Sequence, residues 1–353
     1  MEMKRPLIIS GPCSAESEEQ LISTAQALAA TGKVDILRAG IWKPRTKPNT
    51  FEGVGVEALP WLAKAKELTG LPTTTEVANA KHVESALAHD VDILWVGART
   101  AANPVSMQEV AEALRGSNKM VFVKNPVNID IDLWCGAVER LAVCGVSNIG
   151  LIHRGFSGFG SGELRNAPLW HLALEMRRRM PNLPIICDPS HICGNRKFIA
   201  EIAQQAADLN YDGLMIESHI DPDKAWSDAK QQITPETLAS ILDGIKWRAG
   251  ESNSEQFQSA LLGLREQIDS LDREILQLLS ARMNVAEKIG RIKSENDVRI
   301  LQEVRWEDIV ERALSSSQKL GLSEAFLRTV LDAIHIESIE RQKRVMNELQ
   351  GSK

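Results

Sequence analysis

Residue types that can do chemistry recur in this sequence immediately after short stretches of β-type residues. Eight such stretches can be read, and each is followed within a few positions by a Cys, a His, a carboxylate or a cation. Scattered surface charges would not be expected to follow a strand end eight times. In the order of the eight stretches, the residues are Cys13; Arg38, Lys43 and Arg45 with Thr46; Glu76; Arg99; Lys124; His153 and Arg154; Asp188 and His191; and Glu217 and His219.

One group of these residues combines the donor atoms of a metal site. It offers sulfur, nitrogen and oxygen ligands, which suit a borderline divalent ion such as Mn²⁺, Fe²⁺, Co²⁺ or Zn²⁺. The four candidate ligands are Cys13, His191, Glu217 and the downstream Asp228. We therefore expect a metal cofactor. Asp188 and His219 are expected either to orient these ligands or to cap helices, and the sequence leaves both alternatives open.

A second group is cationic, although the chain as a whole is acidic. The formal net charge is −6 and the pI is near 5.8, so the protein offers no broad basic field to a nucleic acid or an anionic membrane. Cations that converge on one site of an acidic protein are what two phosphorylated substrates would require. The six cations are Arg38, Lys43, Arg45, Arg99, Lys124 and Arg154.

The spacing of the eight stretches predicts the fold that brings these groups together. Stretches with helical apolar spacing separate the β-type runs, and alternating β and α patterns indicate a parallel sheet. Eight units in about 245 residues fit a closed (β/α)₈ barrel better than an open doubly wound sheet, and barrels carry their chemistry at the strand ends. The expected strands are Leu7–Ser10, Val34–Ala39, Leu71–Thr75, Ile93–Val96, Met120–Lys124, Ile149–His153, Ile185–Asp188 and Gly213–Glu217.

A change of composition predicts a domain boundary. All fourteen prolines lie at or before Pro235, and only four of the twenty-three glycines follow residue 256. We expect a barrel domain over 1–248, a polar linker over 249–256 and a helical domain over 257–353. The five cysteines include no CxxC pair, and the sequence shows neither a signal peptide nor an apolar run long enough to span a membrane. A cytoplasmic protein with reduced thiols is expected.

The C-terminal region is predicted to form three helices, one long and two shorter, near 302–318 and 323–349. From Phe257 to Ile292 apolar residues recur at alternating spacings of four and three, which is typical of one long helix with an apolar seam. Arg282 is the only charged residue in that seam, so we expect it to be desolvated and to meet either a bound anion or an internal ion-pair partner. Lys293 lies eleven residues beyond Arg282, close to three helical turns, so its side chain should lie on the same side of the helix. Ser338 and Gln342 are four residues apart on the last helix, so their side chains should be neighbours.

The barrel motifs together resemble a known family. They are Gly-Pro-Cys13-Ser, Arg38-x₄-Lys43-Pro-Arg45-Thr46, Gly-Ala-Arg99-Thr, Lys124-Asn, His153-Arg154-Gly, Asp-Pro-Ser-His191 and Glu217-Ser-His219. Over about residues 5–245 the chain is similar to type I 3-deoxy-D-arabino-heptulosonate 7-phosphate synthase, the first enzyme of the shikimate pathway. The resemblance implies a metal-dependent, aldol-type condensation of phosphoenolpyruvate with erythrose 4-phosphate.

The same resemblance implies a role for each group. The metal ligands would be Cys13, His191, Glu217 and Asp228. The residues that would bind phosphoenolpyruvate are Arg99, Lys124 and Arg154. The reacting centre would be lined by Arg38 and Lys43, and the erythrose 4-phosphate end would be bound by Arg45 and Thr46. Lys43 can also donate a proton or a hydrogen bond to the developing alkoxide. The alternative is 3-deoxy-manno-octulosonate 8-phosphate synthase, which shares the barrel but usually has Lys-Ala-Asn-Arg in place of Lys43-Pro-Arg45-Thr46.

The helical region carries a second resemblance, across about residues 257–345, to the all-helical chorismate mutases. Its motifs are Leu264-Arg265-x₂-Ile268-Asp269-x₂-Asp272, Arg282 with Lys293, Arg305, and Ile336-Glu-Ser338-Ile-x₂-Gln342. The resemblance implies that chorismate is bound through Arg265, Arg282 and Arg305, with Lys293 and Gln342 beside the ether oxygen. Where many members have an acidic residue for the substrate hydroxyl, this chain has Trp306, and Gln302 or Glu303 would have to replace it.

These expectations together predict a bifunctional enzyme and its assembly. Arg265 and Arg282 lie 17 residues apart, which is ~25 Å along a straight helix, too far for both to bind one small dianion from the same chain. We therefore expect a homodimer formed through the helical domain. Cys13 already belongs to the end of the first strand, so we expect no room for the N-terminal regulatory domain that some relatives carry. Regulation is therefore expected from the C-terminal side, with prephenate as the candidate inhibitor. The alternative is that the helical domain is only a ligand-sensing dimerisation module.

Overall fold

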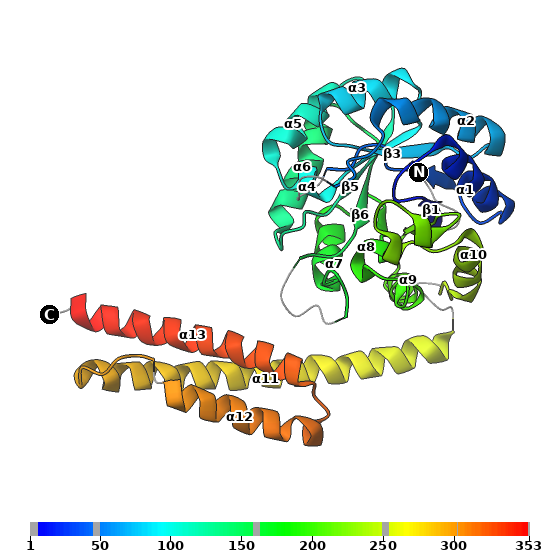
Figure 1. Cartoon of the computed structure of the whole chain (residues 1–353). Coiled ribbons are helices and arrows are strands. Elements are labelled where there is room, and N and C mark those ends of the chain that lie inside the picture. Colours follow the sequence, from blue (N-terminus) through cyan, green and yellow to red (C-terminus); the bar gives the residue numbers. More distant parts are fainter. Residues whose placement is uncertain (1–5, 45–49, 158–162, 249–253, 302, 352–353) are drawn as a thin grey trace. The chain divides into compact units, whose positions relative to one another are not determined.

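The computed structural model describes residues 6–44, 50–157, 163–248, 254–301 and 303–351. The chain divides into two compact units, Met1–Gly250 and Glu251–Lys353. In Figure 1 the first unit is a ring of strands surrounded by helices, and the second consists of long helices packed side by side. No helix among the described residues is long and apolar enough to cross a membrane.

The first unit is a closed barrel of eight parallel strands in sequence order, which confirms the predicted fold class. The barrel closes where β1 pairs with β8, with Leu7 opposite Gly213 and Gly11 opposite Glu217. The strands are β1 Leu7–Gly11, β2 Ile36–Arg38, β3 Thr73–Val77, β4 Ile93–Val96, β5 Met120–Lys124, β6 Ile149–His153, β7 Ile185–Cys187 and β8 Gly213–Glu217.

Helices cover the outside of the barrel. Several begin with a side-chain cap, such as Asn79, whose side chain accepts a hydrogen bond from the backbone N–H of His82. The helices are α1 Glu18–Ala30, α2 Leu59–Thr69, α3 Ala80–Ala88, α4 Ala98–Ala101, α5 Pro104–Ala113, α6 Ile131–Val143, α7 Trp170–Arg179, α8 Pro189–Cys193, α9 Ile199–Asp208 and α10 Pro235–Gly244, with 3₁₀ turns η1 Gly55–Ala58, η2 Pro222–Lys224 and η3 Ala229–Gln231.

The strand bounds agree with the sequence-based prediction for β4, β5, β6 and β8 and differ elsewhere. The third strand was placed at Leu71–Thr75 but runs from Thr73 to Val77. Pro72 has no backbone N–H to donate and serves only as an acceptor, for the N–H of Leu37. Glu76 therefore lies within β3, opposite Trp95, instead of following the strand as predicted.

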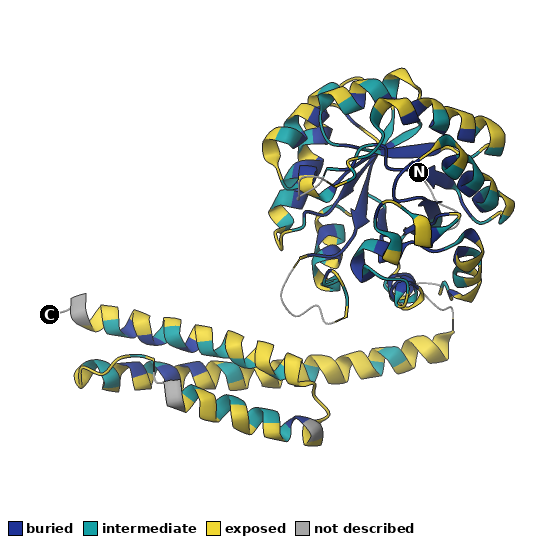
Figure 2. Cartoon of the chain, viewed as in Figure 1, coloured by how far each residue is buried: buried dark blue, intermediate teal, exposed yellow. Residues whose placement is uncertain are grey.

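Two apolar layers stabilise the barrel. A small inner cluster fills its lumen, and a larger cluster lies between the strands and the helices, so the strands in Figure 2 are buried while the outer helix faces are exposed. The buried residues of the inner cluster are Ile9, Ile36, Trp95, Phe122, Ile152, Ile186 and Met215. The interior is therefore a packed core, and in barrels of this kind the chemistry is placed at the carboxyl ends of the strands.

Gly11 permits the close approach of β1 and β2 just before Cys13. Its φ of +152° falls where side chains are rarely tolerated, and a Cβ there would lie 2.0 Å from the carbonyl oxygen of Arg38. The glycine therefore allows the chain after β1 to reach the centre of the barrel mouth.

The second unit contains the three predicted helices, α11 Glu255–Glu295, α12 Glu303–Leu320 and α13 Glu324–Gly351. Helix α11 begins inside the expected 249–256 linker, where the Ser254 side chain accepts a hydrogen bond from the N–H of Phe257. Residues 249–253 of that linker lie outside the described part of the chain. Its buried residues are Met283, Ala286 and Gly290. A Cβ at Gly290 would lie 3.0 Å from the Cα of Gln342, so this glycine lets α11 and α13 pack closely.

Candidate functional site

A buried ion pair joins the ends of β2 and β8 at the mouth of the barrel. A guanidinium nitrogen of Arg38 lies 3.0 Å from Oε1 of Glu217, and both side chains are buried. Oε2 of Glu217 accepts a hydrogen bond of 2.7 Å from the amide of Gln231. Burial acts to raise the pKa of Glu217, but His191, Arg38 and Lys43 outweigh it and lower the pKa. Glu217 is therefore a buried carboxylate.

A second buried pair joins the ends of β5 and β7. Nζ of Lys124 lies 2.7 Å from Oδ2 of Asp188, and Nδ1 of His191 lies 2.8 Å from the same oxygen. The other oxygen of Asp188 accepts a hydrogen bond from the His191 backbone N–H. Burial opposes the charge of Asp188, but His191 and Lys124 hold its pKa well below its usual range. Asp188 thus both caps α8 and contacts the His191 ring.

Trp95 is a residue of this site that the sequence analysis did not identify. Its ring lies beneath two cations, with Cζ of Arg38 4.9 Å and Nζ of Lys124 5.8 Å from a ring centroid. Its indole N–H donates to Oε2 of Glu76. The only signal was a large aromatic residue in a short, otherwise aliphatic strand, because the cations that contact it come from strands distant in sequence.

Lys43 lies against Cys13. Its Nζ donates to the Cys13 carbonyl oxygen at 3.0 Å and lies 2.9 Å from Sγ. The thiol in turn lies 3.4 Å from Oδ2 of Asp228. Burial and the Glu217 carboxylate raise the pKa of Cys13 to about 12, so the thiol is protonated in the absence of a metal.

The four expected metal ligands lie close together as two pairs. Cys13 contacts Asp228, and Nε2 of His191 lies 3.9 Å from Oε1 of Glu217. Within the described ranges no group of three or more His, Cys, Asp or Glu side chains is already arranged as a metal site. Asp228 has a φ of +47°, an uncommon backbone conformation for a residue other than glycine.

Three further predicted residues lie just after strands β4, β6 and β8. Arg154 is buried, and its guanidinium donates to Oδ1 of Asn166 at 2.9 Å; burial lowers its pKa to about 10. Arg99 is exposed on α4, close enough to Arg154 for its charge to lower that pKa further. His219 is buried, with Nε2 lying 3.5 Å from Oε2 of Glu16, and it stabilises the loop after β8. Arg45 and Thr46 lie outside the described residues.

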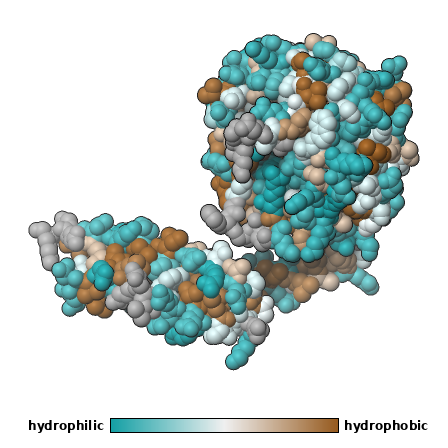
Figure 3. Space-filling view, viewed as in Figure 1, coloured by the Kyte–Doolittle hydropathy of each residue, from teal (hydrophilic) through white to brown (hydrophobic). Residues whose placement is uncertain are grey.

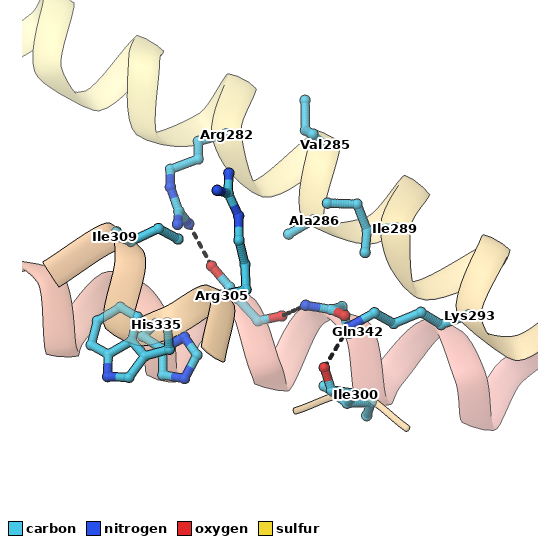
Figure 4. A pocket seen from close by; sticks show the side chains of 12 residues that line it. Arg282, Val285, Ala286, Ile289, Lys293, Ile300, Arg305, Ile309, His335 and Gln342 are labelled. Carbon is cyan, nitrogen blue, oxygen red and sulfur yellow. Dashed lines mark hydrogen bonds between the residues drawn. The ribbon is translucent and has the colours of Figure 1, made fainter. Parts of the chain in front are cut away.

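The helical unit contains a second candidate site, a pocket of about 420 Å³ between its three helices. Figure 4 shows Arg282 and Lys293 of α11, Arg305 of α12 and Gln342 of α13 around this pocket. Five of the predicted residues therefore line one cavity: Arg282, Lys293, Arg305, Ser338 and Gln342. Arg265 does not line it, as the length of α11 requires.

Contacts within the pocket fix its polar groups. A guanidinium nitrogen of Arg282 donates to Oγ of Ser338 at 2.5 Å, and Nζ of Lys293 donates to the carbonyl oxygen of Ile300 at 2.5 Å. Nε2 of Gln342 donates to the Ser338 carbonyl oxygen at 3.3 Å. Oε1 of Gln342 is buried and has no hydrogen-bond partner among the described residues.

The expectation that Arg282 is desolvated is wrong for the single chain, where the residue is exposed. The reason is that α11 packs on its neighbours through Met283, Ala286 and Gly290, which leaves much of the apolar seam open. The pocket is also lined by two residues that stack, Trp306 and His335. His335 carried no signal in the sequence, because only the packing of α12 against α13 brings it into the pocket.

Comparisons with known proteins find a family match for each of the two units. Residues 2–251 match the family described as DAHP synthetase I, and residues 264–343 match the family described as chorismate mutase type II. The phospho-2-dehydro-3-deoxyheptonate aldolase of Thermotoga maritima is 32% identical over 239 residues, which are 68% of each chain. The 2-dehydro-3-deoxyphosphooctonate aldolase of Geobacter sp. is 26% identical over 69% of this chain and 92% of its own length.

Solved structures show the same relationship. The crystal structure of the Thermotoga maritima aldolase superposes with a TM-score of 0.61 at 30% identity and covers 68% of this chain and 67% of that one. A truncated 3-deoxy-D-arabino-heptulosonate 7-phosphate synthase from the same organism gives a TM-score of 0.58 at 28% identity, over 68% of this chain and 84% of that one. The chain therefore belongs to the DAHP synthetase I family of enzymes and carries a C-terminal chorismate mutase type II domain.

Proposed function

We propose that the chain is a bifunctional shikimate-pathway enzyme. Residues 1–248 condense phosphoenolpyruvate with erythrose 4-phosphate to give 3-deoxy-D-arabino-heptulosonate 7-phosphate, and residues 257–353, beyond the linker 249–256, rearrange chorismate to prephenate. The observation that carries the synthase function is the set of buried cations at the strand ends of an acidic protein, with Arg38, Lys124 and Arg154 all nearly enclosed. Arg38 and Lys124 already pair with Glu217 and Asp188, whereas the guanidinium of Arg154 donates to the neutral oxygens of Gly155 and Asn166. A phosphate or carboxylate group of a substrate would supply the anion that this buried cation needs.

A divalent metal fits the donor set at the mouth. Cys13, His191, Glu217 and Asp228 would hold it, and small movements could bring their two contacting pairs around one ion. Oε1 of Glu217 is buried without a hydrogen bond of good geometry from the described residues, although Arg38 lies beside it, so this oxygen has capacity for another ligand. When bound, the ion would supply Lewis-acid polarisation of the sugar aldehyde.

The chain's own residues account for binding and proton transfer. Arg99, Lys124 and Arg154 would bind the phosphate and carboxylate of phosphoenolpyruvate, with Trp95 holding Lys124 in place. Nζ of Lys43 lies beside Cys13, so it would reach an aldehyde oxygen held there and donate a proton or a hydrogen bond as negative charge develops. Arg38 would line the reacting centre, and Arg45 with Thr46 would bind the sugar phosphate.

The test of the synthase function is product formation by the whole chain from phosphoenolpyruvate and erythrose 4-phosphate, with and without chelator. We expect activity that chelator abolishes and added Mn²⁺ or another divalent ion restores. Because octulosonate aldolases also align with the barrel, arabinose 5-phosphate is the discriminating alternative substrate. Turnover of arabinose 5-phosphate in preference to erythrose 4-phosphate would contradict the proposed substrate.

For the helical domain, the pocket supports the mutase mechanism. The rearrangement of chorismate is unimolecular, so the site needs only to hold a compact conformer and to stabilise the ether oxygen as charge builds on it. Lys293 and Gln342 would donate to that oxygen, and Arg282, Arg305 and Ser338 would bind carboxylates. A merely ligand-sensing module would bind chorismate without converting it, so prephenate formation by the full chain decides between the two functions.

We further propose that the helical domain dimerises and that each pocket takes Arg265 from the partner chain. Five successive apolar residues of the α11 seam are each more than half exposed: Leu264, Ile268, Leu271, Ile275 and Leu278. Hydrophobic residues also gather on the face of the helical unit that Figure 3 shows. A second copy of α11 would cover the exposed seam.

The dimer is tested by subunit exchange. Chains carrying Arg265→Ala and chains carrying Arg282→Ala should each be inactive as mutases, whereas mixed dimers should regain about one working site. No recovery after confirmed exchange would contradict a shared site. Both variants should retain full synthase activity, which serves as the control for folding of the barrel.

Prephenate bound in the mutase pocket is the proposed inhibitor of the synthase. A ligand shifts activity only by binding one arrangement of the protein better than another. We expect prephenate to inhibit the synthase of the intact chain and to have no effect after Arg282→Ala. Synthase rates unaltered at saturating prephenate would remove the regulatory role.

A further inference from the structure

Trp306 and His335 form a stacked pair in the wall of the mutase pocket. Their ring centroids are 4.0 Å apart and their planes are inclined by 16°. Trp306 lies on α12 and His335 on α13, and both line the pocket. Stacking on a large indole restricts the rotation of the imidazole, so the pair presents a ring nitrogen in a defined direction.

The position of His335 along α13 groups it with the carboxylate-binding residues. His335 precedes Ser338 by three residues, about one turn, so the two side chains are neighbours on one face of α13. Arg282 donates to Ser338 and is also close enough to His335 for its charge to lower the His335 pKa, an effect that adds to that of burial. Gln342 lies seven residues beyond His335, ~10 Å along the helix, at the Lys293 end of the pocket.

The charges of the pocket indicate which part of a ligand would bind beside Arg282, Ser338 and His335. Its described lining includes the cations Arg282, Lys293 and Arg305 and no carboxylate. A carboxylate of the ligand accepts hydrogen bonds only, and Arg282 and an imidazole N–H can both donate to it. The Ser338 hydroxyl donates to the Ile334 carbonyl oxygen at 2.7 Å and would donate to the ligand by rotating away from it. No hydrogen bond to either ring nitrogen of His335 is found among the described residues, so a ring N–H remains available.

We propose that His335, held by Trp306, is a substrate-binding residue that donates a hydrogen bond to the chorismate carboxylate bound by Arg282 and Ser338. The inference rests on the proposed mutase function and adds a third donor to its carboxylate subsite. Trp306 acts through His335 and is a positioning residue. The carboxylate is bound equally in the ground state and in the transition state, so its loss should change KM and leave kcat nearly unchanged.

The test compares His335→Phe with wild type in the full-length chain. Phenylalanine preserves the stack on Trp306 and removes both ring nitrogens. A hydrogen bond to a charged group corresponds to a KM increase of about tenfold or more, with kcat within about twofold. His335→Gln, which keeps an N–H donor, should recover part of the affinity. Trp306→Phe, which keeps an aromatic partner, should perturb KM less than Trp306→Ala.

The two monomethyl esters of chorismate identify the contact. The effect of His335→Phe on KM should disappear for the ester that blocks the carboxylate at Arg282 and persist for the other ester. A KM within twofold of wild type, or an equal increase for chorismate and both esters, would overturn the proposal. Wild-type turnover of chorismate reports on the mutase function by itself, so failure of that function is distinguished from failure of this inference.

Discussion

Replacing Asp188 by Asn should destabilise the barrel strongly, because this carboxylate is the counter-ion of a buried cation. Lys124 is 5% exposed and lies 2.7 Å from Asp188, which is itself fully buried. Asparagine keeps the shape of the side chain and its oxygen, so it retains the capping contact to the His191 N–H while removing the charge. The variant therefore isolates the electrostatic part of the interaction.

The expected loss of unfolding free energy is about 3–5 kcal/mol, the usual cost of removing one partner of a buried ion pair. The loss of unfolding free energy has an upper limit, because in the variant Lys124 can lose its proton and become neutral. The cost is then that of deprotonating a lysine at pH 7. Moving its pKa from about 10.4 to 7 corresponds to roughly 4.6 kcal/mol at ~1.36 kcal/mol per unit. The two figures agree, so the loss should not exceed about 5 kcal/mol.

Urea unfolding followed by tryptophan fluorescence measures this change in the barrel, because seven of the eight tryptophans lie there and only Trp306 lies elsewhere. Chelator in all samples removes any contribution of bound metal. Glu175→Gln is the matched control, since Glu175 pairs with Arg178 and Arg179 at the surface and its loss should leave the unfolding curve unchanged. A loss below about 1 kcal/mol for Asp188→Asn would refute the assigned role of the pair.

The pH dependence of the same difference gives an independent check. The folded-state pKa of Asp188 is depressed, so the stability it contributes is fully present above its unfolded pKa of about 3.9. That contribution is lost as the pH falls through the lower folded-state pKa. The difference in unfolding free energy between wild type and Asp188→Asn should therefore be constant between about pH 5 and 7 and shrink in more acidic solution. Above about pH 7 it should also shrink, because Lys124 of the variant then loses its proton.

Two further predictions concern the active groups. Cys13→Ala should abolish synthase activity and metal binding while chorismate turnover remains, since a thiolate ligand cannot be replaced by a methyl group; full activity in this variant would remove Cys13 from the metal site. Gln342→Glu should confine mutase activity to acidic pH, because a carboxylate donates a hydrogen bond only when protonated. An unchanged pH–rate profile would show that Gln342 does not contact the reacting oxygen, and Glu340→Gln, on the exposed side of α13, is the control.

Local sequence patterns were sufficient for the barrel but not for its internal contacts. Strand spacing predicted eight units, and the residue types after the strands predicted side chains that lie near the strand ends, except that Glu76 lies within β3 and that Arg45 and Thr46 fall outside the described residues. Which side chains pair there depends on closure of the sheet: Lys124 and Asp188 are 64 residues apart, and no local pattern relates them. Trp95 was missed for the same reason, because its role appears only when Arg38 and Lys124 lie over its ring.

In the helical domain, the periodic pattern predicted a helix but could not predict what packs against its apolar seam. The heptad-like spacing predicted the extent of α11 well, but the spacing is the same whether the seam packs within one chain or against another. In the single chain, α11 buries only Met283, Ala286 and Gly290 at its C-terminal half, and Arg282 next to them is exposed. An arginine that is enclosed in an apolar seam needs an anionic partner to offset the cost of desolvating its charge. The exposure of Arg282, which was expected to be desolvated, and the exposure of the seam have the same explanation in the proposed dimer. There the partner helix and the substrate would together remove Arg282 from water. Subunit exchange between Arg265→Ala and Arg282→Ala chains tests that explanation directly, because only an interleaved seam can return a complete site from two defective chains.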